Sequence, residues 1–129
     1  MAALVVDASA LVEALVGSEL GAAVGTRMRG CELHAPAHVD AEVLSALRQL
    51  HGAGELSADA VTTALGALET APIARHPLVD LLAGAWRARN RFRLVDALYV
   101  ELAEKLTAVL LTADVGLAQA SPIAELVSE

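Results

Sequence analysis

Two short apolar segments near opposite ends of the chain constrain its fold more than any other feature of the sequence. Ala3–Val6 ends at Asp7, and Ala108–Thr112 is followed closely by Asp114. Continuous apolar runs of this length are typical of strands that are buried on both faces, as they are in a parallel sheet. Parallel strands must be joined by long crossover connections, which are usually helical. The two segments therefore predict an α/β fold.

Between and around these segments, apolar residues recur at helical spacing. They predict helices over residues 8–16, 19–29, 39–50, 58–68, 95–106 and 115–120, and a further helix that begins at Pro77 and ends near Asn90. Weaker strands are expected at residues 32–34, 73–75 and 123–127. Strands that alternate with helices predict a single α/β/α sandwich over residues 1–129, with a central, mostly parallel sheet of four to five short strands.

The composition excludes several classes of protein. A net charge of −7 argues against general affinity for nucleic acid, and aromatic residues, at 2%, are too few for a sheet that stacks RNA bases. Cys31 is the only cysteine, which excludes an intramolecular disulfide framework and a Cys-rich zinc site. No apolar run has the length of a membrane span, and the opening residues do not resemble a signal peptide. We therefore expect a cytoplasmic protein with no membrane contact.

Four acidic residues lie where packing favours apolar ones. Asp7 and Asp114 follow apolar strands, and the carboxyl ends of parallel strands border the ligand crevice of an open sheet. Glu42 falls within the apolar stripe of its helix, where an ionised side chain is costly unless it is compensated. Asp96 opens a helix whose neighbouring face is apolar. Three of the four have a simpler alternative, namely helix capping for Asp7 and Asp114 and favourable charge at a helix N-terminus for Asp96.

One explanation covers all four acids, namely that they converge on bound divalent cations. Like charges about 5 Å apart repel by roughly 3 kcal/mol at an effective dielectric near 20, so such a cluster takes up protons or recruits metal. Oxygen ligands without Cys or His favour Mg²⁺ or Mn²⁺ over zinc. A water on such an ion can attack a phosphoryl group, which makes hydrolysis of phosphodiester bonds the reaction class that suits the set best.

Four segments of the chain resemble the PIN-domain ribonucleases, and specifically the VapC toxins of bacterial toxin–antitoxin pairs. They are Val5-Val-Asp-Ala-Ser-Ala-Leu11, Ala41-Glu-Val-Leu-Ser-Ala-Leu-Arg48, Asp96-Ala-Leu-Tyr-Val-Glu-Leu-Ala103 and Leu110-Leu-Thr-Ala-Asp-Val-Gly-Leu117. Each is weak alone, but all four occur in order in a chain of suitable length. The resemblance spans essentially the whole sequence.

The resemblance implies an activity, a site and partners. It implies a metal-dependent ribonuclease that cuts RNA with water and works as a homodimer, and whose active site is covered by a cognate VapB-type antitoxin. It also implies that Mg²⁺ or Mn²⁺ is held by Asp7, Glu42, Asp96 and Asp114, with Ser9 and Thr112 as supporting hydroxyls. The chain departs from many relatives at Ser45, where they have Asn, and at Gly116, near which some have a further acid.

A short basic segment lies just before Asp96. It holds four of the nine basic residues: Arg87, Arg89, Arg91 and Arg93. We hypothesise that Arg91 and Arg93 hold RNA phosphates and that Phe92 stacks on a base. The alternative is that these cations stabilise a helix C-terminus and that Phe92 is buried.

Three other classes of protein remain as alternatives. A receiver-type α/β module also gathers acids at strand ends, but it needs a Lys near a late strand, and the only lysine here is Lys105, within a predicted helix. A haloacid-dehalogenase-type phosphatase needs a second Asp where Ser9 stands. A PIN-like module could also bind partners without catalysis.

Overall fold

The computed structural model describes residues 1–129, and its centre is a sheet of five parallel strands. The strands are β1 (Ala3–Val6), β2 (Glu32–Pro36), β3 (Ile73–His76), β4 (Val109–Thr112) and β5 (Ala124–Leu126). Their order is β3-β2-β1-β4-β5, so the first strand is central. Val5 pairs with His34 of β2 on one side and with Leu110 of β4 on the other.

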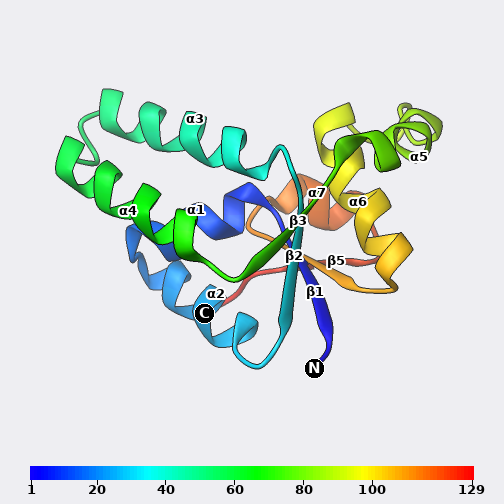
Figure 1. Cartoon of the computed structure of the whole chain (residues 1–129), viewed down its shortest axis with the longest axis horizontal. Helices are drawn as coiled ribbons and strands as arrows, with labels where there is room; N and C mark the ends of the chain where they lie inside the picture. The colour runs from blue at the N-terminus through cyan, green and yellow to red at the C-terminus, as the bar shows by residue number, and fades with distance from the viewer.

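Helices cover both faces of this sheet. They are α1 (Ala8–Val16), α2 (Glu19–Met28), α3 (Val39–Gly52), α4 (Ala58–Thr70), the 3-10 helix η1 (Leu78–Leu81), α5 (Leu82–Arg87), α6 (Leu94–Leu106) and α7 (Val115–Ala120). Figure 1 shows α1 to α4 on one side of the strands and α5 and α6 on the other. The α/β/α sandwich predicted from the sequence is thus confirmed.

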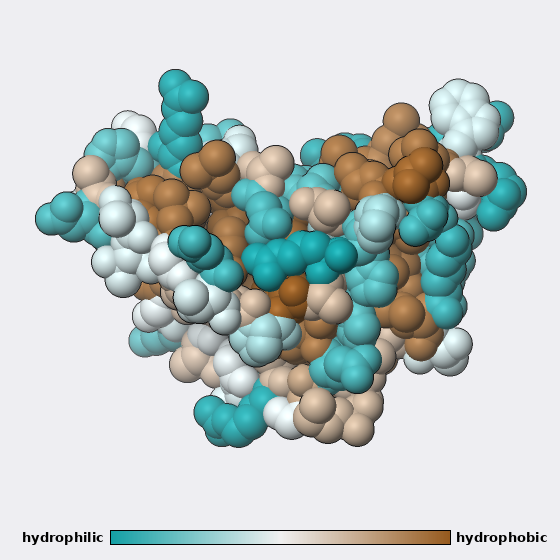
Figure 2. All heavy atoms as spheres, viewed as in Figure 1, coloured by the Kyte–Doolittle hydropathy of each residue, from teal (hydrophilic) through white to brown (hydrophobic).

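The apolar strands are the centre of the core. Leu4, Val5, Val6, Leu110 and Leu111 are each 1% exposed or less. Burial on both faces explains why their sequences are continuous apolar runs rather than alternating ones. Because all five strands are parallel, their carboxyl ends meet at one edge of the sheet. In Figure 1, β1 rises from the N-terminus toward that edge, and Figure 2 shows the molecule hollowed there between two lobes.

The strand order excludes one alternative drawn from the sequence. Receiver domains have the doubly wound order 2-1-3-4-5, whereas β2 here lies between β1 and β3. Lys105, the only lysine, donates to the backbone oxygen of Asp80. The receiver-type reading is therefore wrong.

The helix expected from Pro77 to Asn90 was also predicted wrongly. The structure has a 3-10 turn followed by the short helix α5, and Leu81, in the turn, is only 1% exposed. A 3-10 helix has three residues per turn, so the positions that follow are rotated away from an α-helical stripe. Leu82 and Trp86 are consequently more than half exposed, at 54% and 59%.

No single helix is long and apolar enough to cross a membrane. Helices α1 and α2 reach the required length and composition only as a pair, and they are bent by 114° to one another.

Candidate active site

Asp7 lies directly after β1 at the carboxyl edge of the sheet and is only 5% exposed. Its Oδ1 accepts hydrogen bonds from Ser9 Oγ at 2.7 Å and from the backbone N of Ala10 at 3.0 Å, and its Oδ2 accepts one from Thr112 Oγ1. Burial raises the pKa of Asp7; these donors oppose the rise, and the negative charge of Asp96 adds a smaller upward contribution. No cationic side chain pairs with Asp7.

Two hydroxyl groups connect the ends of β1 and β4. Thr112 donates to Asp7 and accepts from the backbone N of Asp114 at 3.0 Å. Ser9 donates to Asp7 and accepts from the backbone N of Ala113 at 2.9 Å. The hydroxyl of each residue therefore orients Asp7 and fixes the chain that leads into Asp114.

Asp114 and Asp7 also cap helices, as the simpler alternative expected. Asp114 Oδ1 accepts from the backbone N of Leu117 at 3.2 Å, at the start of α7, and Asp7 does the same at the start of α1. Capping uses Oδ1 of each carboxylate and satisfies backbone N–H groups that the helix leaves free. Neither role excludes the other, because a carboxylate has further lone pairs.

Glu42 lies in the first turn of α3 and does not point into the core, since its side chain is 32% exposed. Its Oε1 accepts a hydrogen bond from the hydroxyl of Tyr99 at 2.7 Å and lies 3.4 Å from Nε2 of His38. Burial, and then the bond to Glu42, raise the pKa of Tyr99, so the phenol stays neutral and donates. The His38 nitrogen also lies 3.0 Å from the backbone oxygen of Val95, which connects α3 to the start of α6.

Tyr99 and His38 were not among the site residues expected from the sequence. One signal was present in the spacing. Tyr99 follows Asp96 by three residues on α6, and His38 precedes Glu42 by four, so each shares a helix face with an acid.

Asp96 lies in the first turn of α6, with a side chain that is 19% exposed. Its Oδ2 accepts from Nε of Arg93 at 3.1 Å. The bond to Asp96 raises the pKa of Arg93, and the charges of Asp114 and Glu42 add to the rise. The guanidinium of Arg93 therefore lies in the field of three of the four acids.

The basic segment is only partly as expected. Phe92 is 8% exposed and belongs to the core, so the expectation that it stacks on a base is wrong for this conformation, and the alternative of a buried Phe92 holds. Arg91 lies over the Phe92 ring, 5.1 Å from its centroid, and Arg89 lies 4.3 Å from the centroid of Trp86. Of these arginines, only Arg93 pairs with one of the four acids.

The structure thus brings the predicted acids to one edge of the sheet. Their side chains do not already form a coordination sphere for a metal ion. Asp96 and Asp114 line one surface pocket together with Arg93 and Gly116, while Glu42 and Ser9 line the neighbouring one. No three His, Cys, Asp or Glu side chains are arranged to hold a metal ion as they stand.

The donor set nevertheless fits a hard divalent cation. It consists of carboxylate oxygens, and one of them, on Asp7, is buried beside other acids without a cationic partner. Gly116 brings no ligand, and a Cβ at that position would lie 3.2 Å from Oδ1 of Asp114.

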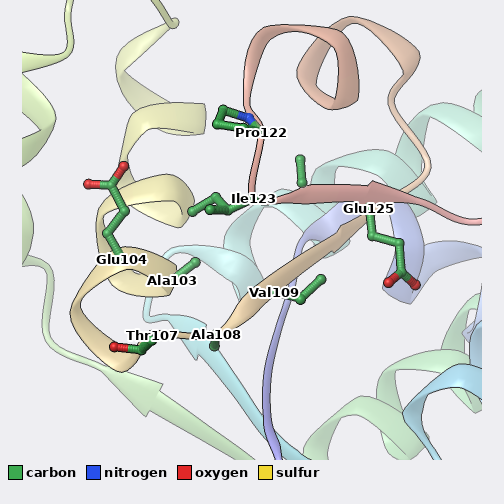
Figure 3. Close-up of a pocket in the computed structure, with 9 residues that line it drawn as sticks. Ala103, Glu104, Thr107, Ala108, Val109, Pro122, Ile123 and Glu125 are labelled. Atoms are coloured by element: carbon green, nitrogen blue, oxygen red, sulfur yellow. The ribbon is translucent and has the colours of Figure 1, made fainter.

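Another pocket lies at the opposite edge of the sheet. Figure 3 shows it between the end of α6 and the amino ends of β4 and β5, with Glu104 and Glu125 on opposite sides of it. Its other lining residues are mostly apolar. It shares no residue with the acidic edge, so we do not include it in the candidate site.

An α/β/α sandwich with acids gathered at the carboxyl edge of its parallel sheet is the arrangement expected of a PIN domain, and the PIN domain profile matches residues 4–121. The chain belongs to the PIN-domain family, within its VapC group, as the following relatives show.

Several relatives come from Mycobacterium tuberculosis, and two of them illustrate the similarity. Ribonuclease VapC3 is 53% identical over 121 residues, which cover 93% of this chain and 88% of that protein. Ribonuclease VapC12 is 39% identical over 116 residues, which cover 90% of each chain. Among solved structures, PAE2754 from Pyrobaculum aerophilum superposes with a TM-score of 0.70 at 25% identity, over 95% of this chain and 82% of the other.

Proposed function

We propose that this protein is a metal-dependent endoribonuclease toxin that hydrolyses phosphodiester bonds of RNA and is neutralised by a cognate VapB-type antitoxin. The observation that carries the proposal is the buried Asp7, which has hydroxyl and backbone donors but no cation, at an edge where three further acids gather. The names of the VapC relatives support the same activity.

The cofactor we propose is Mg²⁺ or Mn²⁺, held by Asp7, Glu42, Asp96 and Asp114. When bound, such an ion supplies Lewis-acid stabilisation of a phosphoryl group and lowers the pKa of a bound water. The residues of the chain prepare this site. Ser9 and Thr112 orient Asp7, and Tyr99 orients Glu42.

Cleavage of labelled RNA by the purified protein tests the activity. We expect cleavage with Mg²⁺ or Mn²⁺, loss of cleavage with excess chelator, and recovery when the metal is restored. The Asp7→Asn variant is the matched negative control. Cleavage that persists under chelation would exclude the metal, and a folded wild-type protein that cuts no RNA would favour a non-catalytic PIN-like module.

The RNA contacts we propose are made by Arg91 and Arg93. Arg93 is 73% exposed at its side chain and lies beside Asp96 and Asp114, in the pocket that Arg91 also lines. Guanidinium groups bind phosphate oxygens well because their donors are planar and paired.

We also propose that the protein forms a homodimer in the cytoplasm. The support is an exposed apolar surface on η1 and α5, where Val79 is 72% exposed and Leu82 is 54% exposed; Figure 2 shows apolar atoms gathered over this part of the molecule. Light scattering after size-exclusion chromatography tests the proposal. We expect twice the chain mass of 13.3 kDa, and a return to the chain mass in a Val79→Glu, Leu82→Glu variant. A monomeric wild-type protein would contradict it.

A further inference from the structure

Among the arginines and the lysine, only Arg93 makes an ion pair with one of the four predicted metal-binding acids. The other basic side chain beside such an acid is that of His38, next to Glu42. Arg93 is the last residue before α6, and its side chain folds back on the first turn to reach Asp96, three residues on. The contact uses Nε, at 3.1 Å from Oδ2 of Asp96, and Arg93 makes no other side-chain hydrogen bond. Its two terminal nitrogens therefore remain free.

The charges around Arg93 favour this position. The carboxylate of Asp96 has the largest effect on the guanidinium, and smaller effects come from Asp114, at the start of α7, and from Glu42 on α3. Asp96 and Asp114 line the same pocket as Arg93. A positive charge thus already stands among the acids that we propose hold a divalent cation.

The ion pair between Arg93 and Asp96 is also easily broken. The Arg93 side chain is 73% exposed, and exposed ion pairs stabilise proteins only weakly because water and salt screen them. One guanidinium also leaves most of the charge of four carboxylates uncompensated, so it weakens the attraction for a divalent cation without replacing it.

We propose that Arg93 is a built-in counter-ion of the acidic site, which pairs with Asp96 in the metal-free protein and is displaced from it when a divalent cation binds. The inference rests on the proposed function, because it takes these acids as the metal ligands. In the metal-free protein Arg93 thus neutralises part of the charge of Asp96 and competes with the metal for it. After displacement the whole guanidinium is available to a phosphate at the same edge.

The neighbouring arginine provides a matched control. Arg91 lies two residues away, and its guanidinium lies over the Phe92 ring, 5.1 Å from the centroid, rather than on an acid. Arg91→Gln and Arg93→Gln remove the same charge from the same segment. A difference between them therefore reports the contact with Asp96 rather than the net charge of the protein.

Binding of Mn²⁺ alone to the full-length protein, measured by electron paramagnetic resonance and calorimetry, tests the proposal without reference to cleavage. We expect Arg93→Gln to bind Mn²⁺ about three- to tenfold more tightly than wild type, because a competing charge beside the ligands is gone. Arg91→Gln should change the affinity by less than about twofold, since its guanidinium makes no ion pair with the acids and its charge is screened. Arg93→Lys, which restores the charge, should bring the affinity back toward that of wild type.

The outcomes separate this inference from the proposed function. If wild type binds Mn²⁺ and Arg93→Gln binds it equally or more weakly, the counter-ion role is overturned and the metal site stands. If wild type binds no more Mn²⁺ than Asp7→Asn, both are overturned. Circular dichroism before titration checks the folding of each variant, and Arg93→Met, which also removes the charge, takes the place of Arg93→Gln if that variant proves unstable.

Discussion

At the scale of the residue, Asp7 combines a structural and a proposed chemical role in one carboxylate. One oxygen caps α1 and accepts from Ser9, and the other accepts from Thr112. Burial raises its pKa, so the charged form is held at a cost when no cation is near. Buried ionisable groups with a shifted pKa are typical of functional sites.

Replacing the charged acids should therefore remove activity and spare the fold. We expect Asp7→Asn and Asp96→Asn to abolish metal-dependent RNA cleavage, while the metal-free free energy of unfolding stays within about 1 kcal/mol of wild type or rises. Asparagine keeps the capping geometry at position 7 and relieves like-charge repulsion. Urea denaturation beside a cleavage assay measures both effects. Unfolding of Asp96→Asn would show that Asp96 is a structural residue.

Thr112 offers a second test, because its hydroxyl is fully buried between Asp7 and the backbone of Asp114. Thr112→Val keeps the shape but leaves the N–H of Asp114 without its partner, so we expect a loss of about 1–3 kcal/mol in stability. Cleavage should fall as well, since Asp7 loses a donor that orients it. Thr112→Ser retains the hydroxyl and should keep most of the activity. Equal activity in the two variants would contradict this role of the hydroxyl.

At the scale of the element, the crossing of α1 and α2 depends on close approach of their backbones. The two helices are bent by 114° at a tight turn, where Gly17 adopts a φ of 73°. Ser18 caps α2 by accepting from the backbone N of Gly21. A Cβ at Gly21 would lie 2.0 Å from the carbonyl oxygen of Glu13 in α1. The glycine is therefore required by the crossing and not by its own backbone conformation.

Two glycines of α2 provide a matched comparison. Gly21→Ala forces backbone against backbone and should cost about 2–3 kcal/mol of unfolding free energy. Gly25→Ala meets nothing within 4 Å and should stabilise the protein, by about 0.5–1 kcal/mol, because alanine favours helix over glycine. Chemical denaturation of both variants measures the difference. Equal stabilities would mean that the helices can separate at no cost.

At the scale of the whole molecule, the sheet should respond to pH through two histidines on β2 and β3. Nδ1 of His34 lies 2.9 Å from Nε2 of His76, and Nε2 of His34 lies 2.6 Å from a carboxylate oxygen of Glu32. Burial, and then the charge of His34, lower the pKa of His76, while Asp80 opposes the change. The two rings can share a hydrogen bond only if one of the facing nitrogens is unprotonated.

The lowered pKa sets the direction of the pH dependence. Below the ordinary value of 6.5 the unfolded chain takes up a proton at His76 that the folded protein resists. The contribution of His76 to the free energy of unfolding is therefore fully present above pH 6.5. It falls as the pH decreases through 6.5 toward the lower pKa of the folded state. Urea denaturation between neutral and mildly acidic pH measures this fall, and His76→Gln should flatten it. An unchanged slope in that variant would assign the effect to other groups.

The uneven charge of the molecule should appear in the salt dependence of RNA cleavage. The net charge is −7, so phosphate binding must depend on local cations such as Arg91 and Arg93. Reversal of both to Glu should weaken cleavage at low salt and reduce the salt slope by about one to two units. Steady-state cleavage at several salt concentrations measures the slope. An unchanged slope would show that RNA contacts other parts of the surface.

The parallel sheet and the position of Asp7 and Asp114 at its carboxyl edge could be inferred from local patterns alone, whereas the order of the strands came only from the structure. Val5 and Leu111 lie in apolar runs that only a doubly covered parallel sheet can bury, and the acid after each run must then lie at its carboxyl edge. The contacts of those acids could not be inferred in this way. Tyr99 reaches Glu42 across 57 positions in the sequence, and Phe92 is buried while Arg93 turns to Asp96. These contacts depend on how α6 is placed against α3 and the sheet, and that placement results from packing over the whole chain. Apolar periodicity in the sequence indicates only which face of each helix is covered.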